Sequence, residues 1–492
     1  MATFLTYSFS LMKLLVFSSL SLILVSCFVK KSNAFEGRKD STSATGIHFH
    51  TVKISSLLPA SVCTTSSIKG TSNKRQSTLE VYHRYGPCSQ LGQDKANPTT
   101  IPSLSEILMN DEFHVKSIQA QVNPNSNTKN LNDKKANLPV QSGRSLDTGN
   151  YIVTIGLGTP KKTLSFAFDT GSDLTWTQCE PCAGSCYEQQ EPIFNPSTST
   201  TYSNVSCSSA QCSQLLSATG NKPGCTSSST CIYEILYGDL SSSVGFLSKD
   251  KLTITRDTFP NFLFGCGQDN EGLFGKTAGI LALGRNPISI ISQTAQKYGK
   301  YFSYCLPSTS SQTGYLTLGK NKVSDNVKFT PFDNSHGQTF YFINILSITI
   351  GGRQLPIEQS VFKTSGCIID SGTVITRLPP AAYATMRIEF GKQMSKYKIA
   401  PAFSILDTCY DVSGYTTITI PVISFTFSGN VKVNLAPSEI LVAASATTIC
   451  LAFASNKDVS DVGIFGNTQQ KTFEVIYDVA GGKLGFGPGG CQ

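Results

Sequence analysis

One short pattern occurs twice in the sequence, and each copy contains an aspartate that could do chemistry. The pattern is an apolar residue, Asp, Thr or Ser, Gly, and Ser or Thr, at residues 168–172 and 369–373, so that Asp169 and Asp370 are 201 residues apart. Each copy is followed later by an apolar pair and a glycine, at residues 282–284 and 464–466. A single copy would indicate an ordinary turn. The repeat predicts a duplicated lobe that contributes one carboxylate per copy to a shared site.

Two carboxylates a few ångströms apart cannot both ionise, so one keeps its proton. Such a pair could hold a water molecule, take a proton from it and donate a proton to an amide carbonyl oxygen. We expect Gly171 and Gly372 to let the backbone approach closely, and Ser172 and Thr373 to hydrogen-bond the carboxylates. This chemistry requires no metal and no cofactor. Which aspartate is the acid stays open.

From residue 151 onward, short β-rich runs are broken by Gly, Pro, Asn and Asp, which predicts an all-β architecture. Strands are predicted at residues 151–157, 164–168, 251–254, 340–350 and 472–477, and helices at residues 289–298 and 381–397. Residues 35–144 are polar, and we interpret them as a basic prosegment. Within them, residues 79–84 alternate like a strand that could pair with the body, and residues 103–115 have helical spacing.

Residues 1–34 carry Lys13, an apolar stretch and a small-residue exit, which predicts a secretory signal peptide. A plastid transit peptide is the alternative, because residues 35–75 are rich in Ser, Thr and basic side chains. No second long apolar run follows, so we expect a soluble mature product, with a processing site near residues 136–148.

The formal net charge of +8 lies entirely in the leader. Residues 1–144 hold 16 Lys and Arg against 8 Asp and Glu, whereas residues 145–492 hold 24 of each kind. A basic leader over a neutral body indicates a removable docked segment rather than a folded DNA-binding domain.

Thirteen of the 16 cysteines fall in residues 145–492. Cys179, Cys182 and Cys186 could suggest zinc, but no His lies near them and no second CxxC completes a four-thiolate site. With an export signal, disulfides are the better interpretation. An odd number leaves one thiol free or paired outside this region. Asn204, in an Asn-x-Ser triplet, is a predicted glycosylation site.

Both aspartate motifs match those of the pepsin-like aspartic proteases, which the chain resembles over about residues 148–492. The resemblance implies a bilobal fold with a deep cleft, an N-terminal lobe at residues 145–328 and a C-terminal lobe at residues 329–492. It implies that Asp169 and Asp370 are the catalytic pair and that Tyr237 lies on a β-hairpin flap over the substrate. It also implies that Trp176 hydrogen-bonds that tyrosine.

The cysteine-rich insertion at residues 179–231 is similar to that of the plant branch containing the nepenthesins. That branch implies six disulfides, with Cys367 left over as a small buried residue. The twelve cysteines are Cys179, Cys182, Cys186, Cys207, Cys212, Cys225, Cys231, Cys266, Cys305, Cys409, Cys450 and Cys491. Residues 81–88 are similar to precursors of a narrower plant group that includes an apoplastic defence-related protease and a chloroplast-nucleoid DNA-binding protease.

Three functions follow as hypotheses. The first is a monomeric, secreted aspartic endopeptidase, acting on polypeptides at acidic pH and made as a zymogen whose basic leader covers the cleft until low pH releases it. The second is a catalytically silent binding or inhibitor protein on the same fold. The third is a DNA-binding protease that keeps its leader. The apoplast is the expected location, with the chloroplast or vacuole as alternatives.

Overall fold

The computed structural model describes residues 48–59, 61–64, 77–91, 102–122, 151–237, 241–272, 274–320 and 326–490. The predicted signal peptide and the predicted processing region lie outside these ranges. Residues His48–Gln492 form one unit, so contacts between the leader and the body are internal to it. Among the described residues, no helix has the length and apolar character needed to cross a membrane.

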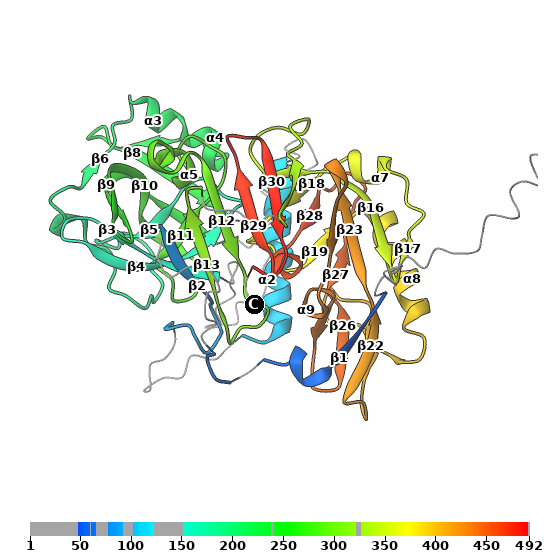
Figure 1. The fold of residues 1–492 in the computed structure, drawn as a ribbon. Helices are drawn as coiled ribbons and strands as arrows, with labels where there is room; N and C mark the ends of the chain where they lie inside the picture. The colour runs from blue at the N-terminus through cyan, green and yellow to red at the C-terminus, as the bar shows by residue number, and fades with distance from the viewer. Residues whose placement is uncertain are drawn as a thin grey trace, which may run out of the picture. The chain divides into compact units, whose positions relative to one another are not determined.

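The described chain is mostly β-strand and has two lobes, which confirms the expected fold class (Figure 1). Its largest sheet has 15 strands in the order β14-β30-β29-β12-β13-β2-β3-β4-β11-β5-β10-β9-β8-β7, with β6 paired to β9. In that order the strands are Lys328–Pro331, Lys483–Gly487, Glu474–Asp478, Tyr301–Cys305, Thr313–Leu318, Thr78–His83, Tyr151–Leu157, Lys162–Asp169, Gly279–Ala282, Trp176–Gln178, Asp257–Glu271, Ser242–Ile254, Cys231–Leu236 and Gly224–Cys225, and β6 is Ser203–Asn204.

Smaller sheets build the C-terminal lobe. One has the order β15-β18-β28-β19-β27, with strands Phe342–Ile343, Cys367–Ile369, Gly463–Phe465, Thr376–Leu378 and Phe453–Ser455. Another has the order β17-β16-β23-β24, with strands Arg353–Gln354, Ile345–Ile350, Ile423–Phe427 and Val431–Asn434. A third has the order β20-β21-β26-β25, with strands Lys398–Ala400, Cys409–Asp411, Thr448–Leu451 and Leu441–Ala443. The last pairs β1, Phe49–Lys53, with β22, Thr417–Pro421.

Helices are few and mostly short. They are α2 Leu104–Val122, α3 Ala210–Ser213, α4 Leu215–Thr219, α5 Ile290–Gln293, α6 Ala295–Tyr298, α7 Ser360–Lys363, α8 Pro380–Gln393 and α9 Pro437–Ile440. The predicted helix at residues 381–397 is confirmed as α8, which begins with a proline in its first turn. The single helix predicted at residues 289–298 is wrong. Ser289 caps α5, but Thr294 leaves helical geometry and divides the segment into α5 and α6.

Burial follows the strand positions in the sheets. Strand β3, predicted with its observed bounds, lies inside the large sheet and is buried along nearly all of its length. Strand β9 alternates between buried and half-buried residues, as expected when one face is covered. The single strand predicted at residues 340–350 is wrong, because β15 pairs with β18 whereas β16 pairs with β23. The chain therefore changes sheets at Asn344.

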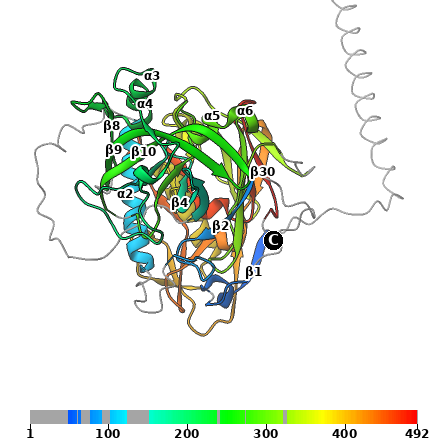
Figure 2. The ribbon, with the colours of Figure 1, turned by 90° about the vertical axis from the view of Figure 1, so that its left-hand side faces the viewer.

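The leader is built into both lobes. Figure 1 shows β2 in one lobe and β1 beside β22 in the other, and Figure 2 shows the same leader elements, with α2, from the side. Strand β2 pairs along five residues with β13 and also with β3, inside the large sheet. Strand β1 pairs along five residues with β22 in the C-terminal lobe. The predicted strand pairing is confirmed, and the predicted helix is confirmed as α2, which extends to Val122.

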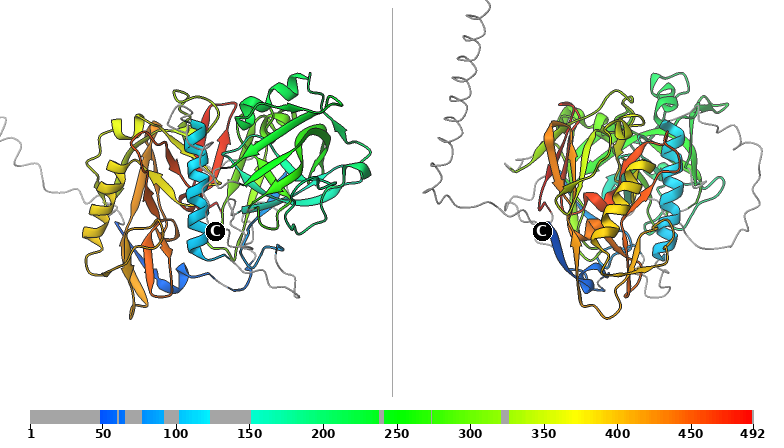
Figure 3. Two further views of the ribbon diagram at one scale, coloured as in Figure 1. Left: turned by 180° about the vertical axis from the view of Figure 1, so that it is seen from behind. Right: turned by 90° about the vertical axis from the view of Figure 1, so that its right-hand side faces the viewer.

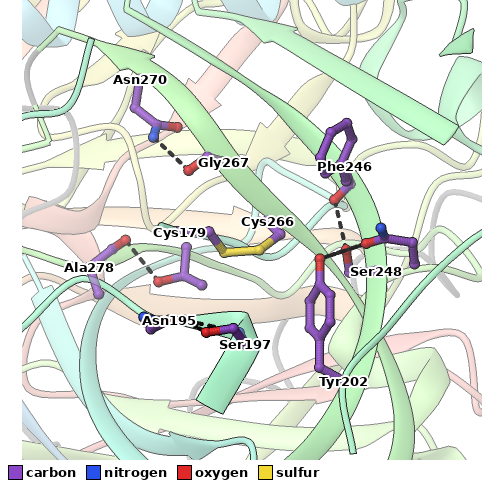
Figure 4. The surroundings of a disulfide bond; sticks show 12 residues. Cys179, Asn195, Ser197, Tyr202, Phe246, Ser248, Cys266, Gly267, Asn270 and Ala278 are labelled. Atoms are coloured by element: carbon purple, nitrogen blue, oxygen red, sulfur yellow. Dashed lines mark hydrogen bonds between the residues drawn. A yellow bond between two sulfur atoms is a disulfide. The ribbon is translucent and has the colours of Figure 1, made fainter. Parts of the chain in front are cut away.

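Disulfides tie the insertion to the sheet. Cys179–Cys266 joins the end of β5 to β10, next to the hydrogen bond between Tyr202 and Ser248 (Figure 4). The other pairs of the body are Cys182–Cys186, Cys207–Cys225, Cys212–Cys231 and Cys409–Cys450. Cys305 is also disulfide-bonded, and Cys491 lies outside the described residues. A leader disulfide, Cys63–Cys88, was not predicted. The described chain leaves Cys367 free and buried, as expected.

Candidate active site

The two predicted aspartates stand at matching places in the two lobes. Asp169 ends β4, and Asp370 directly follows β18. Each of these strands lies beside a parallel strand, β11 or β28, that ends in one of the apolar–glycine patterns noted in the sequence. Leu283 N donates to Asp169 O at 2.8 Å, and Asp370 N donates to Phe465 O at 3.1 Å. Both aspartates are therefore held by the ends of buried sheets rather than by free loops.

A reciprocal pair of hydrogen bonds joins the two motifs across the lobes. Thr170 N donates to Ser371 Oγ at 3.1 Å, and Ser371 N donates to Thr170 Oγ1 at 2.8 Å. Thr170 Oγ1 also lies 3.3 Å from Asp370 Oδ1. All these residues are buried, with Asp370 at 0% and Asp169 at 7% exposure. The bonds bring the carboxylates of the two lobes together.

Backbone amides point at both carboxylates. Gly171 N donates to Asp169 Oδ1 at 2.9 Å, and Gly372 N donates to Asp370 Oδ1 at 3.2 Å. A Cβ atom on Gly372 would lie 2.6 Å from Asp169 Oδ1, and one on Gly171 would lie 2.9 Å from Asp370 Oδ1. Glycine is therefore the residue that these two close approaches permit.

The hydroxyl neighbours differ between the lobes. Thr373 donates to Asp370 Oδ2 from both its backbone N and its Oγ1, at 2.8 and 2.7 Å. Ser172 acts to lower the pKa of Asp169, but its hydroxyl forms no hydrogen bond of ordinary geometry. The two predicted supporting hydroxyls are thus not equivalent, and Asp370 is the more strongly stabilised anion.

A leader residue that the sequence did not single out enters this site. Helix α2 runs between the two lobes, where Figure 3 shows it in cyan. Its His114 Nε2 lies 3.0 Å from Asp370 Oδ2, and the side chain is 9% exposed. We expected the basic leader to cover the cleft. On this helix, the basic group that reaches the carboxylates is a single imidazole, that of His114. The sequence offered only the helical spacing of the segment and an isolated histidine.

A second group on α2 anchors the helix to the C-terminal lobe. The Asp111 carboxylate accepts from Val374 N at 2.5 Å and from Ile375 N at 3.1 Å, the two residues directly after the second motif. It also pairs with Arg377 at 3.0 Å, with both side chains buried. Asp111 and His114 are three residues apart, so they share one face of the helix.

Apolar side chains extend this contact along the helix. Leu108 packs in a cluster with Ile375 and Leu406, and Val115 and Ile118 pack with Phe342 and other residues of the C-terminal lobe. The helix is therefore docked by buried apolar surface as well as by charge.

While α2 is bound, the pKa values of Asp169, Asp370 and His114 are shifted in different directions. Burial raises the pKa of Asp169, and repulsion from Asp370 raises it further. Burial also acts to raise the pKa of Asp370, but the hydrogen bond and charge of His114 outweigh it and hold this pKa below the usual range. Burial acts to lower the pKa of His114, but Asp370 outweighs it and raises this pKa to about 9. At neutral pH, Asp370 is ionised and His114 is protonated.

The residues that could hold a metal ion are these same three. Their ligand atoms all lie within 4.8 Å of one another, and no other such group occurs among the described residues. His114 contacts Asp370 directly, which is the geometry of an ion pair between protein groups. The expectation of no metal and no cofactor stays a prediction.

The predicted flap tyrosine and the single tryptophan are in contact. Tyr237 directly follows β8, which forms an antiparallel hairpin with β9. Trp176 Nε1 donates to Tyr237 Oη at 2.8 Å. The Phe274 ring packs edge-on against Trp176, with centroids 4.7 Å apart, and lies 5.6 Å from the Tyr237 ring. Tyr237 lines the same pocket as Asp169 and His114.

Two further predicted positions lie away from this pocket. Cys367 is in β18, three residues before Asp370, and burial raises the pKa of its thiol to about 12. Asn204 is exposed in β6 on the insertion, and its Oδ1 accepts a hydrogen bond from Tyr202 at 2.7 Å. Its glycosylation stays a prediction.

Known proteins are similar to this chain along most of its length. The family profile described as Xylanase inhibitor N-terminal matches residues 151–320, and the one described as Xylanase inhibitor C-terminal matches residues 340–488. An aspartyl protease family protein of Arabidopsis thaliana is 50% identical over 476 residues, covering 96% of this chain and 98% of the relative. Aspartyl protease AED1 of Arabidopsis thaliana is 46% identical, with coverage of 96% and 98%. Aspartic proteinase nepenthesin-2 of Nepenthes gracilis is 36% identical, with coverage of 73% and 83%.

Solved structures agree on the fold. Basic 7S globulin from soybean has a TM-score of 0.55 at 22% identity, covering 69% of this chain and 91% of that one. The structure named edgp has a TM-score of 0.57 at 20% identity, with coverage of 70% and 92%. Together with the sequence relatives, these matches show that the chain belongs to the pepsin-like aspartic protease family of plants.

Proposed function

We propose that this protein is an aspartic endopeptidase made as a precursor whose own leader blocks the catalytic pair. The relatives named as aspartic proteases support a protease function. The observation that carries the finer proposal is the pair Asp169 and Asp370, held at matching strand ends by the reciprocal Thr170–Ser371 hydrogen bonds. These bonds supply the shared geometry that two-carboxylate catalysis needs.

The proposed reaction begins when α2 leaves and a water molecule takes the place of the His114 imidazole. One carboxylate accepts a proton from this water, whose oxygen then attacks the carbonyl carbon of the peptide bond. The protonated carboxyl donates its proton to the carbonyl oxygen, and the tetrahedral intermediate then collapses by releasing the amine, which takes up a proton. The Gly171 and Gly372 amides stabilise the carboxylates by hydrogen bonds throughout.

Extended polypeptides are the proposed substrates, because the Tyr237 hairpin and the pocket beside it suit a chain bound in an extended form. An acidic optimum follows as a proposal from the need for one protonated carboxyl. Secretion, with removal of residues 1–34, is proposed from the leader composition, and a monomer is proposed from the two lobes within one chain.

A silent binding protein is the second candidate, because the matching family profiles are described as xylanase inhibitors. Both aspartates and both glycines of the pair are intact, which favours the protease. Binding of DNA by a retained leader is less favoured, because α2 docks into the site through Asp111 and His114 and its described face there carries no basic stripe.

The test is cleavage of an unstructured protein by the purified precursor between pH 3 and pH 8. Asp169→Asn and Asp370→Asn are compared with the unaltered protein and with Asp458→Asn, an exposed control on the C-terminal lobe. Processing and cleavage in the unaltered protein and the control, with neither in the two site variants, is the expected result. A folded, fully processed and inert protein would favour the binding function.

A further inference from the structure

A second cation from the leader reaches the candidate active site. Arg84 directly follows β2 and is 3% exposed. It lines the pocket beside the catalytic pair, whose walls include Asp169, Tyr237, Phe274, Thr277 and Ile280. Its Nη2 donates to Phe274 O at 2.6 Å and to Thr277 Oγ1 at 3.1 Å. The guanidinium group is therefore held in place inside the pocket by oxygen acceptors.

The orientation of the Thr277 hydroxyl leaves its oxygen free to accept a hydrogen bond from a side chain in this pocket. Thr277 Oγ1 donates its own hydrogen to Phe274 O at 2.7 Å. Its lone pairs are thereby left to accept from the guanidinium group of Arg84. With Arg84 in place, Phe274 and Thr277 are 3% and 0% exposed. When Arg84 leaves, the Phe274 carbonyl keeps the Thr277 hydroxyl as a donor, whereas Thr277 Oγ1 loses the donor it has in Arg84. An acceptor that loses its donor in a poorly solvated place costs free energy, which an incoming donor recovers.

Both acceptors are fixed relative to the catalytic pair. Ala278, the residue after Thr277, donates from its N to Ser165 O at 2.7 Å. The following strand, β11, pairs with β4, which ends at Asp169. The Phe274 ring packs against Trp176 and Tyr237. Strand register and ring packing thus set the distance from these acceptors to Asp169.

We propose that the pocket filled by Arg84 is a side-chain subsite of the enzyme that selects arginine in polypeptide substrates. This proposal rests on the proposed endopeptidase function. In the precursor, Arg84 occupies the place of a substrate arginine, and its departure with the leader opens the subsite. The pocket offers a neutral carbonyl and a hydroxyl as acceptors, with the Asp169 carboxyl on its wall. Both acceptors bind the same nitrogen, Nη2, so a substrate side chain that places an N–H donor where Arg84 places Nη2 should be preferred, and arginine reproduces that position directly.

The test uses the processed enzyme and quenched fluorescent peptides that differ at one position. A library of peptides from a digested proteome first locates the position, relative to the cut, at which basic residues are enriched. That position is then filled with arginine, lysine, citrulline or norleucine. We expect kcat/KM for arginine to exceed that for norleucine about tenfold, with lysine and citrulline between them, since polar sites discriminate against analogues that leave acceptors unpaired.

Variants of the acceptor complete the test. Thr277→Val should reduce the arginine-to-norleucine ratio to about threefold or less, and Thr277→Ser, which keeps the hydroxyl, should restore it. Cleavage without any preference for arginine would overturn the subsite, and so would a ratio unchanged by Thr277→Val. If Thr277→Val is inactive, the four peptides with the unaltered enzyme decide the question. Absence of all cleavage by the unaltered processed enzyme contradicts the proposed endopeptidase function itself.

Discussion

Replacing His114 by glutamine in the full-length precursor should loosen α2 most strongly near pH 5. The His114–Asp370 contact raises the pKa of His114 from 6.5 to about 9. This difference in pKa means that the docked helix favours the protonated imidazole over the neutral one by about 3 kcal/mol more than the undocked helix does. Because the side chain is 9% exposed, solvent screens this interaction little. Removing the charge should therefore raise the undocked population of α2 on the order of 100-fold.

The pH dependence follows from the directions of the two pKa shifts. The raised pKa of His114 means that its contribution is complete below pH 6.5 and is lost as the pH rises through about 9. The lowered pKa of Asp370 means that its contribution is complete above the usual carboxylate range and is lost as the pH falls toward that lowered pKa. The ion pair is thus strongest around pH 5 and 6. Asp370 therefore becomes protonated only at a lower pH than an ordinary aspartate does.

Hydrogen exchange of the amides of Leu104–Val122, followed by mass spectrometry, measures this effect without requiring activity. His114→Gln should lose protection there at pH 5, and its precursor should process faster. Lys116→Gln is the matched control, because Lys116 is exposed on the same helix. Equal protection in His114→Gln and the unaltered protein at pH 5 would refute the reasoning. A difference that stays undiminished at pH 10 would also refute it.

Other substitutions test the remaining contacts. Asp111→Asn leaves Glu112, at 3.4 Å, as the carboxylate partner of the buried Arg377, so we expect the unfolding free energy of the precursor, measured in urea, to fall by about 2 kcal/mol. An unchanged urea midpoint would contradict the anchor. Trp176→Phe removes the hydrogen-bond donor to Tyr237, so kcat/KM of the processed enzyme should fall about tenfold. If stability falls while kcat/KM stays unchanged, Trp176 contributes only to packing. The Cys367 thiol should resist a disulfide reagent at pH 8 until the protein is unfolded, because burial raises its pKa to about 12; labelling of Cys367 in the folded protein would contradict this.

The sequence was sufficient for the parts of the fold that repeat or alternate. The duplicated motif predicted two lobes. Strand β2 followed from alternation, and helix α8 followed from the proline at the helix start. Predictions were wrong where the backbone changes partner without a change in composition. Residues 340–350 are mostly apolar, and the polar residue Asn344 gives no signal that β15 and β16 join different sheets. Likewise, Thr294 breaks the helical segment at a residue of ordinary polarity.

The pair of aspartate motifs could be found from the sequence alone, because their flanking residues are local features of the chain and the pattern repeats. The tertiary structure alone decided what covers them. Asp111 and His114 meet the C-terminal lobe, and Arg84 meets Thr277, across separations of roughly 190 to 260 residues. No local propensity encodes such contacts, because they join segments that lie far apart along the chain.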